Sequence, residues 1–411
     1  GDPAPIDEEV PPSVIFISLD TLRYDHCGFN GYERDTTPFL DKLAKESIVF
    51  DRAYTTMSWT LIAHMSMLTG LYPTQHGVMN SEVALTTEFP TLAERLHREG
   101  YLNAGVYSNG WVGERYGFGR GFDSYDRAYK VQMVDASVKK SMKAVRRGFP
   151  YFQFIHLFDI HSASFTAPGS TIYNPPPPYN SMFVEDASER LAGIDAAAWW
   201  DHPVSPTPEQ HEAVVALYDG GIRYVDSLLE GWFTDWEERG LLDNTIVVIT
   251  ADHGEGLRQR RENYGGHGGL HEEGLRVPLL IRLPGGERGG ERSAQLTSLV
   301  DIVPTILDIA GLAGDDRLPG RSAVGPPRAE NQWVFAARDS ISAAISLDRK
   351  VVYSDNGPMR LYDLKGDPGE LDVLLPERGQ RKEFTDIVQP ILDGALVELE
   401  SFFKPGQALS I

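Results

Sequence analysis

The stretch that decides the fold is TIVVITADHGE, residues 245–255. Its first six residues form a β-branched apolar run of strand length, which predicts a parallel strand buried on both faces of a sheet. Asp252 and His253 then follow at the carboxyl end of that strand, where open α/β sheets carry their chemistry. A carboxylate beside an imidazole, with Gly254 allowing a sharp turn, suits a divalent metal ion. A capped turn after a strand has the same sequence, so this pair alone leaves both interpretations open.

A second strand end points the same way. Residues 13–19 are another apolar run, and they bring Asp20 to the same edge of a parallel sheet. A lone aspartate after a strand is typical of a turn or a helix N-cap. Two strand-end carboxylates together with a histidine favour a metal site. The sequence therefore predicts that Asp20, Asp252 and His253 meet at one centre.

A hydroxyl group is predicted at the start of a helix between these strands. Residues 63–68 have helical character, Gly70 and Pro73 mark the end of the helix, and Thr60 falls where it would begin. The positive pole of a helix favours an anion and lowers the cost of an alkoxide. Thr60 is therefore either a nucleophile for an anionic ester or simply an N-cap. His64, four residues on, would share its helix face and is a second candidate catalytic residue.

The order of these motifs resembles the sulfatase-like branch of the alkaline phosphatase superfamily, and the resemblance covers nearly the whole chain. The matching segments are Asp20, residues 68–78 (LTGLYPTQHGV), 121–123 (GFD), 222–226 (IRYVD), 252–255 (DHGE), 270–278 (LHEEGLRVP), 361–364 (LYDL) and 367–370 (DPGE). The resemblance implies a doubly wound, mostly parallel α/β sheet. After Gly320 short alternating strands predict a small antiparallel subdomain. We expect a tether at residues 1–12, a catalytic domain at 13–320 and a C-terminal α+β subdomain at 321–411.

The departures from sulfatases bear on the chemistry. Sulfatases convert the Cys or Ser of a Cys/Ser-x-Pro-x-Arg motif to formylglycine, whereas this chain has TLIAH at residues 60–64. Thr60 lacks the primary alcohol or thiol that the conversion oxidises, and Cys27, the only cysteine, lies elsewhere. Two lysines of the sulfatase pocket are matched here by Asn109 and His267. No formylglycine is expected, and a cation has been exchanged for a potential metal ligand.

That exchange resembles the phosphatase and nucleotide phosphodiesterase branches, which keep a Ser or Thr nucleophile and bind two metal ions. The implied first site is Asp20, Thr60, Asp252 and His253, and the implied second site is Asp159, His161 and His267. The Asp-x-His spacing at 159–161 differs from the Asp-x-x-x-His of those branches, which leaves the roles of His156 and His161 open. His156 could instead be a core imidazole bonded to a carbonyl. Zinc or manganese is the first choice, with calcium or magnesium as alternatives, and Asn109 could donate to an ester oxygen.

The composition of the chain limits the kinds of partner that it could bind. The net charge of −21 over 411 residues argues against nucleic acid as a bound polyanion, and no run is long enough to span a bilayer. The Pro-rich acidic start, with the family resemblance, favours a periplasmic or extracellular protein, although a cytoplasmic one is not excluded. One cysteine excludes an internal disulfide. An insertion at about 165–210 is either a lid over the site or a packed surface loop.

These observations predict a metal-dependent hydrolase that cleaves phosphate-type esters through Thr60. Its partner would be a small anionic ester, either a phosphodiester, a phosphonate or a phosphomonoester. Three alternatives remain: a sulfuric ester hydrolase without formylglycine, a phospho-headgroup transferase, and a metal-binding relative that has lost catalysis. The oligomeric state is not addressed by the sequence.

Overall fold

The computed structural model describes residues 10–373, apart from 130, 147, 163–170, 193, 195, 197–198, 200–204, 260–264, 268, 330–331, 339–340 and 355–359. Most of the predicted tether, part of the insertion and the last part of the C-terminal subdomain therefore lie outside the described residues.

The catalytic domain is built on one eight-stranded sheet. Its order is β10 (Arg292–Ser298), β2 (Ile48–Tyr54), β9 (Leu279–Arg282), β6 (Thr245–Thr250), β1 (Ser13–Leu19), β5 (Tyr151–Leu157), β3 (Leu102–Tyr107) and β4 (Ser124–Arg127). β9 runs antiparallel to β2 and β6, while the other neighbouring pairs are parallel. The predicted mostly parallel sheet is confirmed.

The three central strands bring the predicted ligands together. Every residue of β1, β5 and β6 is buried, as expected for strands that are apolar on both faces. Ser18 of β1 is paired with Thr250 of β6 and with His156 of β5. Because the strands are parallel and in this register, Asp20 and Asp252 leave the sheet at the same edge.

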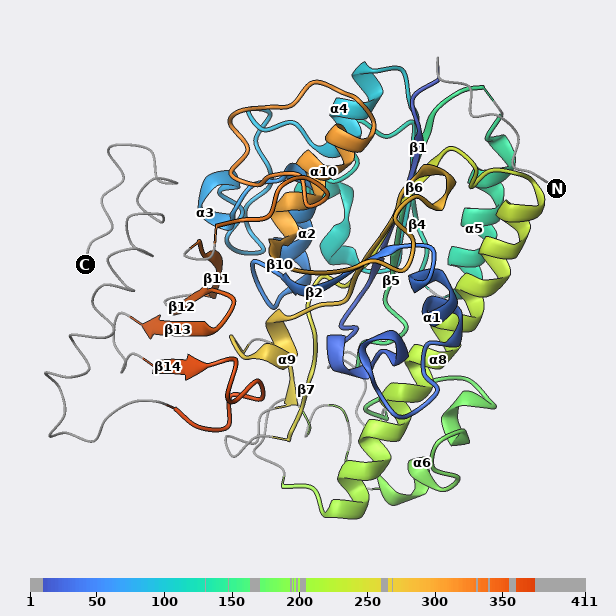
Figure 1. The fold of residues 1–411 in the computed structure, drawn as a ribbon. Helices are drawn as coiled ribbons and strands as arrows, with labels where there is room; N and C mark the ends of the chain where they lie inside the picture. Colours follow the sequence, from blue (N-terminus) through green and yellow to red (C-terminus); the bar gives the residue numbers. More distant parts are fainter. Residues whose placement is uncertain are drawn as a thin grey trace, which may run out of the picture.

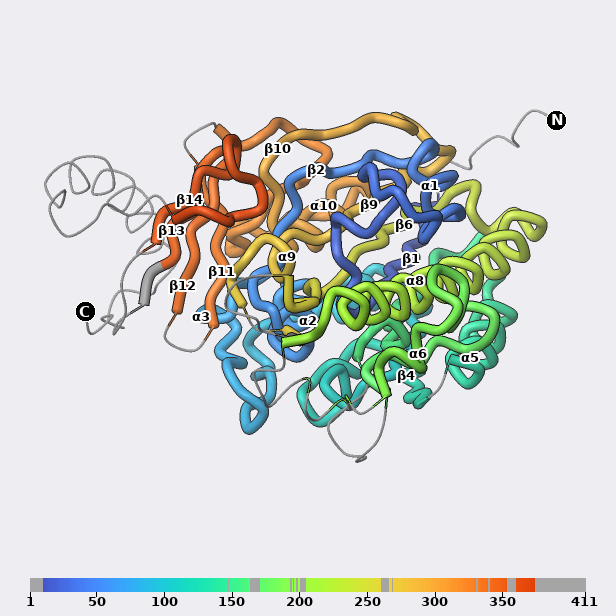
Figure 2. Tube along the Cα trace, turned by 90° about the horizontal axis from the view of Figure 1, so that it is seen from below, coloured from blue at the N-terminus to red at the C-terminus, as the bar shows by residue number. Residues whose placement is uncertain are grey.

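Helices cover both faces of the sheet, which makes the domain doubly wound as expected (Figure 1). α1 (Pro38–Ala44), α5 (Val131–Ala144) and α8 (Pro208–Glu238) lie on one face, and α2 (Thr60–Thr69), α4 (Leu92–Arg98) and α10 (Ile302–Ile309) lie on the other. The view from below shows the same two layers (Figure 2). Shorter elements are α3 (Pro73–His76), α6 (Ala187–Arg190), α9 (Glu272–Leu275) and the two-stranded pair β7 (Gly256–Leu257) and β8 (Gly265–Gly266). No helix in the described ranges is long and apolar enough to cross a membrane.

A separate antiparallel sheet follows the catalytic domain, as predicted. It consists of β11 (Val334–Arg338), β12 (Ile341–Ile345), β13 (Arg349–Ser354) and β14 (Arg360–Asp363) in chain order. It lies at the β10 side of the molecule (Figures 1 and 2). The backbone N–H of Ala337 in β11 donates to the oxygen of Thr56, at 3.0 Å. The small sheet is thus attached to the loop that leads into α2.

One side chain in the described part of the insertion packs into the core. Trp199 is completely buried, and the guanidinium of Arg258 lies 4.7 Å from the centre of its ring. This aromatic side chain anchors the segment beside the turn that follows Asp252 and His253.

Candidate metal centre and active site

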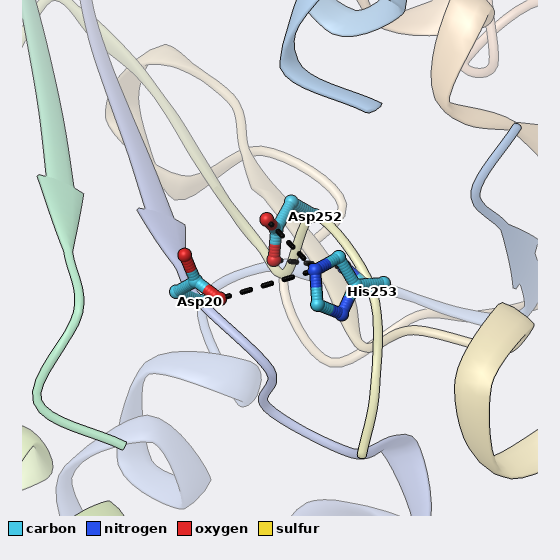
Figure 3. Close-up of side chains that lie close together, drawn as sticks. All are labelled: Asp20, Asp252 and His253. Carbon is cyan, nitrogen blue, oxygen red and sulfur yellow. Dashed lines mark hydrogen bonds and ion pairs between the residues drawn. The ribbon is translucent and has the colours of Figure 1, made fainter. Parts of the chain in front are cut away.

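Asp20, Asp252 and His253 form one cluster at the carboxyl edge of the central strands. All three are completely buried, and one ligand atom from each lies within 4.8 Å of the other two. His253 Nε2 is 3.4 Å from Asp252 Oδ2 and 4.0 Å from Asp20 Oδ1. Figure 3 shows the two carboxylates and the imidazole facing one another from the ends of β1 and β6. The predicted meeting of these three residues is confirmed.

The polar atoms of this cluster fit a divalent cation. Asp20 Oδ1 and Asp252 Oδ2 are buried and accept no hydrogen bond within the described residues. His253 Nδ1 donates to the oxygen of Gly254 at 2.9 Å, which leaves Nε2 with its lone pair directed at the carboxylates. Burial raises the pKa of both Asp20 and Asp252, because it removes the charged carboxylates from water. A cation would supply the missing partner for both.

The Thr60 hydroxyl faces this cluster. Thr60 is the first residue of α2, and its Oγ1 lies 3.4 Å from Asp20 Oδ2 and 3.4 Å from His253 Nε2. Trp59 occupies the N-cap position, and α2 has no side-chain cap. The interpretation of Thr60 as an N-cap is therefore wrong, because Trp59 is the N-cap residue and the Thr60 hydroxyl is directed at Asp20 and His253 rather than at the helix backbone.

His64 lies behind Thr60 rather than in front of it. The ring is completely buried. Its Nδ1 lies 2.8 Å from the backbone carbonyl oxygen of Thr60, and its Nε2 lies 2.9 Å from Ser18 Oγ. Burial lowers the pKa of His64 to about 3, so the ring is neutral at neutral pH. Nδ1 then donates to the backbone carbonyl of Thr60, and Nε2 accepts a hydrogen bond from the Ser18 hydroxyl. With both nitrogens engaged, His64 supports the first turn of α2 and acts as a positioning residue.

His156, whose role the sequence leaves open, contacts a metal ligand. Its Nε2 is 3.1 Å from Asp20 Oδ2, and burial lowers the pKa of the ring to about 4. A neutral imidazole that donates to a carboxylate fixes the orientation of that carboxylate. The partner is Asp20 and not the backbone carbonyl expected of a core histidine.

His161 and His267 form a second pair of ligand type. Their Nε2 atoms are 3.1 Å apart, and His161 Nδ1 donates to the oxygen of Ser162 at 2.6 Å. The ring of His267 also lies 4.6 Å from that of His253, centre to centre. Two nitrogens that share one ion at about 2.0–2.1 Å are separated by roughly 2.9–3.4 Å for angles of 90–110°. The observed separation falls within that range.

Asp159 is not brought to these histidines. It is half-buried beside α8, and it makes no hydrogen bond or ion pair with His161 or His267 among the described residues. Burial raises the pKa of its carboxyl to about 6. The ring of Phe158 stacks on that of His161, with centres 4.2 Å apart, and Asp159 and Ile160 are the central residues of the turn between them. Of the three residues expected in the second metal site, only His161 and His267 lie together among the described contacts.

Asn109 lies at the end of β3 with one half of its amide engaged. Its Oδ1 accepts a hydrogen bond from the N–H of Trp111 at 3.0 Å and caps the short helix at Gly110–Val112. The amide nitrogen remains as the donor that an ester oxygen would need. The side chain is partly exposed, as a substrate-binding residue must be.

Two residues near the centre were not singled out by the sequence. Ser18 supports His64, but a serine inside a strand gives no signal of such a role. Glu255 is completely buried, and neither carboxylate oxygen has a hydrogen-bond partner within the described part of the chain. Burial raises its pKa well above the ordinary value, and the negative charges of Asp20 and Asp252 add to this. Its position in the DHGE motif could have marked it.

Together these residues define an α/β protein with a buried Asp, Asp and His group that could hold a divalent metal ion and a hydroxyl directed at that group from a helix start. Comparison with known proteins gives the family. The Sulfatase family model matches residues 12–312, and the chain belongs to that family. It is a hydrolase acting on ester bonds of the sulfate or phosphate type, in the sulfatase-like branch of the alkaline phosphatase superfamily.

The chain is similar both to a sulfatase and to phosphonate monoester hydrolases. An arylsulfatase of Clostridium perfringens is 24% identical over 484 residues, covering 97% of this chain and 97% of that protein. A phosphonate monoester hydrolase of Silicibacter pomeroyi has the same fold, with a TM-score of 0.75, 19% identity and coverage of 94% and 96%. That of Agrobacterium radiobacter gives a TM-score of 0.73, 21% identity and coverage of 94% and 96%.

Proposed function

We propose that the protein hydrolyses phosphate-type esters, with Thr60 as the nucleophile and two divalent metal ions as cofactors. The observation that carries the proposal is the Thr60 hydroxyl, 3.4 Å from both Asp20 and His253 at the start of α2. The chain has Ile62 and His64 where the formylglycine motif has Pro and Arg. Thr60 is therefore taken to act as an unmodified alcohol.

The proposed first ion is held by Asp20, Asp252, His253 and the Thr60 oxygen. The second is held by His161 and His267, without Asp159. Zinc or manganese suits these mixed imidazole and carboxylate ligands, with calcium or magnesium as alternatives. When bound, such ions lower the pKa of an attacking hydroxyl and stabilise negative charge on ester oxygens.

The residues of the chain then have distinct tasks. Thr60 Oγ1 attacks the phosphorus as its hydrogen passes toward Asp20 Oδ2, 3.4 Å away. The ester bond between phosphorus and the organic group breaks, and the alkoxide that leaves takes up a proton from water. The first backbone N–H groups of α2 and the amide nitrogen of Asn109 donate to the non-bridging oxygens. His64 and His156 hold Thr60 and Asp20 in place. The phosphothreonine formed on Thr60 is finally cleaved by water.

A sulfuric ester hydrolase with unmodified Thr60 is the second candidate, because an arylsulfatase matches 97% of the chain. Formylglycine releases sulfate by collapse of its hydrate, and threonine offers no such route. A transferring phosphoryl group also carries more negative charge than a sulfuryl group, so it gains more from a cationic centre. Family membership further supports a periplasmic or extracellular location as part of the proposal.

The test compares esters that share one aryl leaving group: a phosphomonoester, a phosphodiester, a phosphonate and a sulfate. The best phosphate-type ester should exceed the sulfate in kcat/KM by at least about a hundredfold, roughly 2.7 kcal/mol of transition-state discrimination. Elemental analysis of the active protein should find two ions per chain. Equal or faster cleavage of the sulfate would overturn the assignment, and one ion in fully active protein would remove the second site.

Two variants separate the nucleophile from its alternatives. Thr60→Ala should fold and keep its metal, because the hydroxyl caps no backbone group, yet lose turnover by orders of magnitude. Thr60→Ser keeps the hydroxyl and should keep activity. Near-native turnover in Thr60→Ala would mean that water attacks the ester directly.

A further inference from the structure

Arg127, the last residue of β4, is an exposed cation at the carboxyl edge of the sheet. It makes no hydrogen bond or ion pair among the described residues, although the chain has 59 acidic residues against 38 basic ones. Exposed arginines elsewhere do find carboxylates: Arg288 pairs with Glu291, and Arg317 pairs with Asp315. The N–H donors of Arg127 therefore remain available to a ligand.

The guanidinium of Arg127 is nevertheless held in one place. Its Cζ lies 4.2 Å from the centre of the Tyr129 ring, where a cation is attracted to the aromatic face. Its Nη2 lies 2.9 Å, and its Cζ 3.6 Å, from the point that a Cβ on Gly110 would occupy. The group thus packs where Gly110 lacks a side chain. Because these two contacts already order the planar group, it loses little entropy when its N–H donors bind a ligand.

These contacts place the guanidinium beside the candidate site but outside its centre. Gly110 directly follows Asn109, the proposed donor to an ester oxygen, at the end of β3. Only β5 separates β3 from β1, the strand that leads to Asp20. Neighbouring strands are about 4.8 Å apart, so the ends of β1 and β3 are roughly 10 Å apart. That span exceeds a hydrogen bond to a phosphoryl group at Asp20, but a small organic group can bridge it.

We infer that Arg127 binds a second negatively charged group of the substrate, an oxyanion carried by the organic part of the ester. The inference rests on the proposed function and names the class of ester that the site accepts. The flat fork of an arginine matches two oxygens of a carboxylate, a sulfonate or a second phosphate group. Arg127 is thus a specificity-determining residue, which favours esters with two anionic groups separated by a small ring or chain.

The test measures kcat/KM for three phenyl esters of one phosphate class that differ only in the para group: carboxylate, sulfonate or the neutral carboxamide. It compares the wild type with Arg127→Gln, and each variant value is divided by the wild-type value for the same ester, so that intrinsic reactivity cancels. Arg127→Gln should lose about fivefold on a charged ester, the scale of one exposed but well-aligned ion pair, and less than about twofold on the carboxamide. A loss confined to the carboxylate or to the sulfonate identifies the oxyanion.

Two further variants separate a local contact from a general loss of charge. Arg115→Gln removes the same charge from another exposed arginine, which lies 4.7 Å from the Tyr116 ring but already donates to the oxygen of Ser81 at 3.2 Å. It should leave all three ratios near one. Arg127→Lys keeps a positive charge and should recover most of the loss on the charged esters.

Three results would overturn the inference. Equal losses of Arg127→Gln on all three esters would mean that Arg127 acts on the reacting phosphoryl group itself. No loss on either charged ester would remove the subsite. A selective loss of the same size in Arg115→Gln would reduce the effect to the overall charge of this edge.

Failure of the proposed function gives a different result. If the wild type cleaves none of the three esters, calorimetry can compare its binding of 4-carboxyphenylphosphonate and 4-carbamoylphenylphosphonate. A preference for the carboxylate that Arg127→Gln loses and Arg115→Gln keeps would support the subsite without the catalytic proposal. Equal binding of the two compounds by the wild type would overturn the subsite as well.

Discussion

Replacing Lys350 with Met should loosen the attachment of the C-terminal sheet to the catalytic domain. Lys350 of β13 is completely buried, and its Nζ lies 2.6 Å from Glu370 Oε1 and 3.4 Å from Glu272 Oε1. Glu272 begins α9, five residues after His267. The cluster therefore joins the small sheet to the segment that carries a proposed metal ligand.

The size of the effect follows from what each carboxylate retains. Removing one partner of a buried ion pair costs about 3–5 kcal/mol, because the other charge is left buried. Glu370 Oε2 still accepts the N–H of Glu272 at 2.9 Å, and Glu272 Oε2 still accepts the hydroxyl of Tyr54 at 3.1 Å. Since each carboxylate keeps at least one donor, we expect a loss near the lower end, about 3 kcal/mol at pH 8.

The loss should depend on pH in a defined direction. Burial alone would raise the pKa of Glu370, but Lys350 and His271 outweigh it and hold the pKa below the ordinary 4.5. A carboxylate with a lowered folded-state pKa stabilises the protein above its ordinary pKa and loses that contribution as the pH falls. Without Lys350 the pKa of Glu370 should rise above 4.5, so the residue takes up a proton in mild acid. The destabilisation should therefore be smaller at pH 5.5 than at pH 8, by about 1.4 kcal/mol for each unit by which the pKa of Glu370 in the variant exceeds 5.5.

Urea unfolding at both pH values, with hydrogen exchange of the β13 and β14 amides, measures this. Arg349→Met is the matched control, since the neighbouring Arg349 pairs with Asp363 at 2.7 Å with both side chains about one-third exposed. An exposed pair should cost less than about 1 kcal/mol. A loss below about 1 kcal/mol for Lys350→Met at pH 8, or a loss that does not shrink at pH 5.5, would refute the reasoning.

Three further predictions concern the centre and its support. Zinc or manganese at a hundred times its dissociation constant should stabilise the wild type by about 2.7 kcal/mol. Asp252→Asn should lose most of this stabilisation, measured by thermal unfolding, and most of the bound metal, measured by elemental analysis. Equal stabilisation of the variant would contradict a metal site at Asp252. Burial lowers the pKa of His76 to about 3, and the neutral ring accepts the N–H of Val78 at Nδ1. The contribution of His76 to the stability of the fold is therefore complete above pH 6.5, the ordinary pKa of histidine, and is lost as the pH falls. His76→Gln should abolish about 2 kcal/mol of the stability that the wild type loses between pH 7.5 and 5, and an unchanged pH dependence would exclude this. Gly70 ends α2 at φ 72°, with Val303 3.0 Å from where a Cβ would lie, so Gly70→Ala should cost about 1–2 kcal/mol in urea unfolding, and a neutral result would show that the turn relaxes.

The strands and the helix start that carry the centre could be predicted because each is a local property of the sequence. The runs at 13–19 and 245–250 coincide with β1 and β6, since a strand covered on both faces must be apolar throughout. The polar residue after such a run is then at the sheet edge. The mainly apolar run at 299–309 coincides in the same way with the turn at Leu299–Asp301 followed by α10.

The residues that the sequence misjudged or left open depend on loop conformation. Asp159 and His161 are two positions apart, yet they belong to one turn, and no described hydrogen bond or ion pair joins the Asp159 carboxylate to His161. A difference of one residue separates Thr60 as an N-cap from Thr60 as the first helical residue, and periodicity does not resolve a boundary that finely.

The sequence by itself determined that Asp20 and the Asp252-His253 pair end buried parallel strands and that a helix starts at or next to Thr60, because burial and helix periodicity act on neighbours in the chain. Only the tertiary structure decided which side chains meet. The strand order β6, β1, β5 pairs Ser18 with Thr250 on one side and with His156 on the other, and this register brings the His156 ring to Asp20. The packing of α2 against the sheet brings the Thr60 hydroxyl to His253. Strand order and register result from contacts between segments more than a hundred residues apart, and no local pattern encodes them.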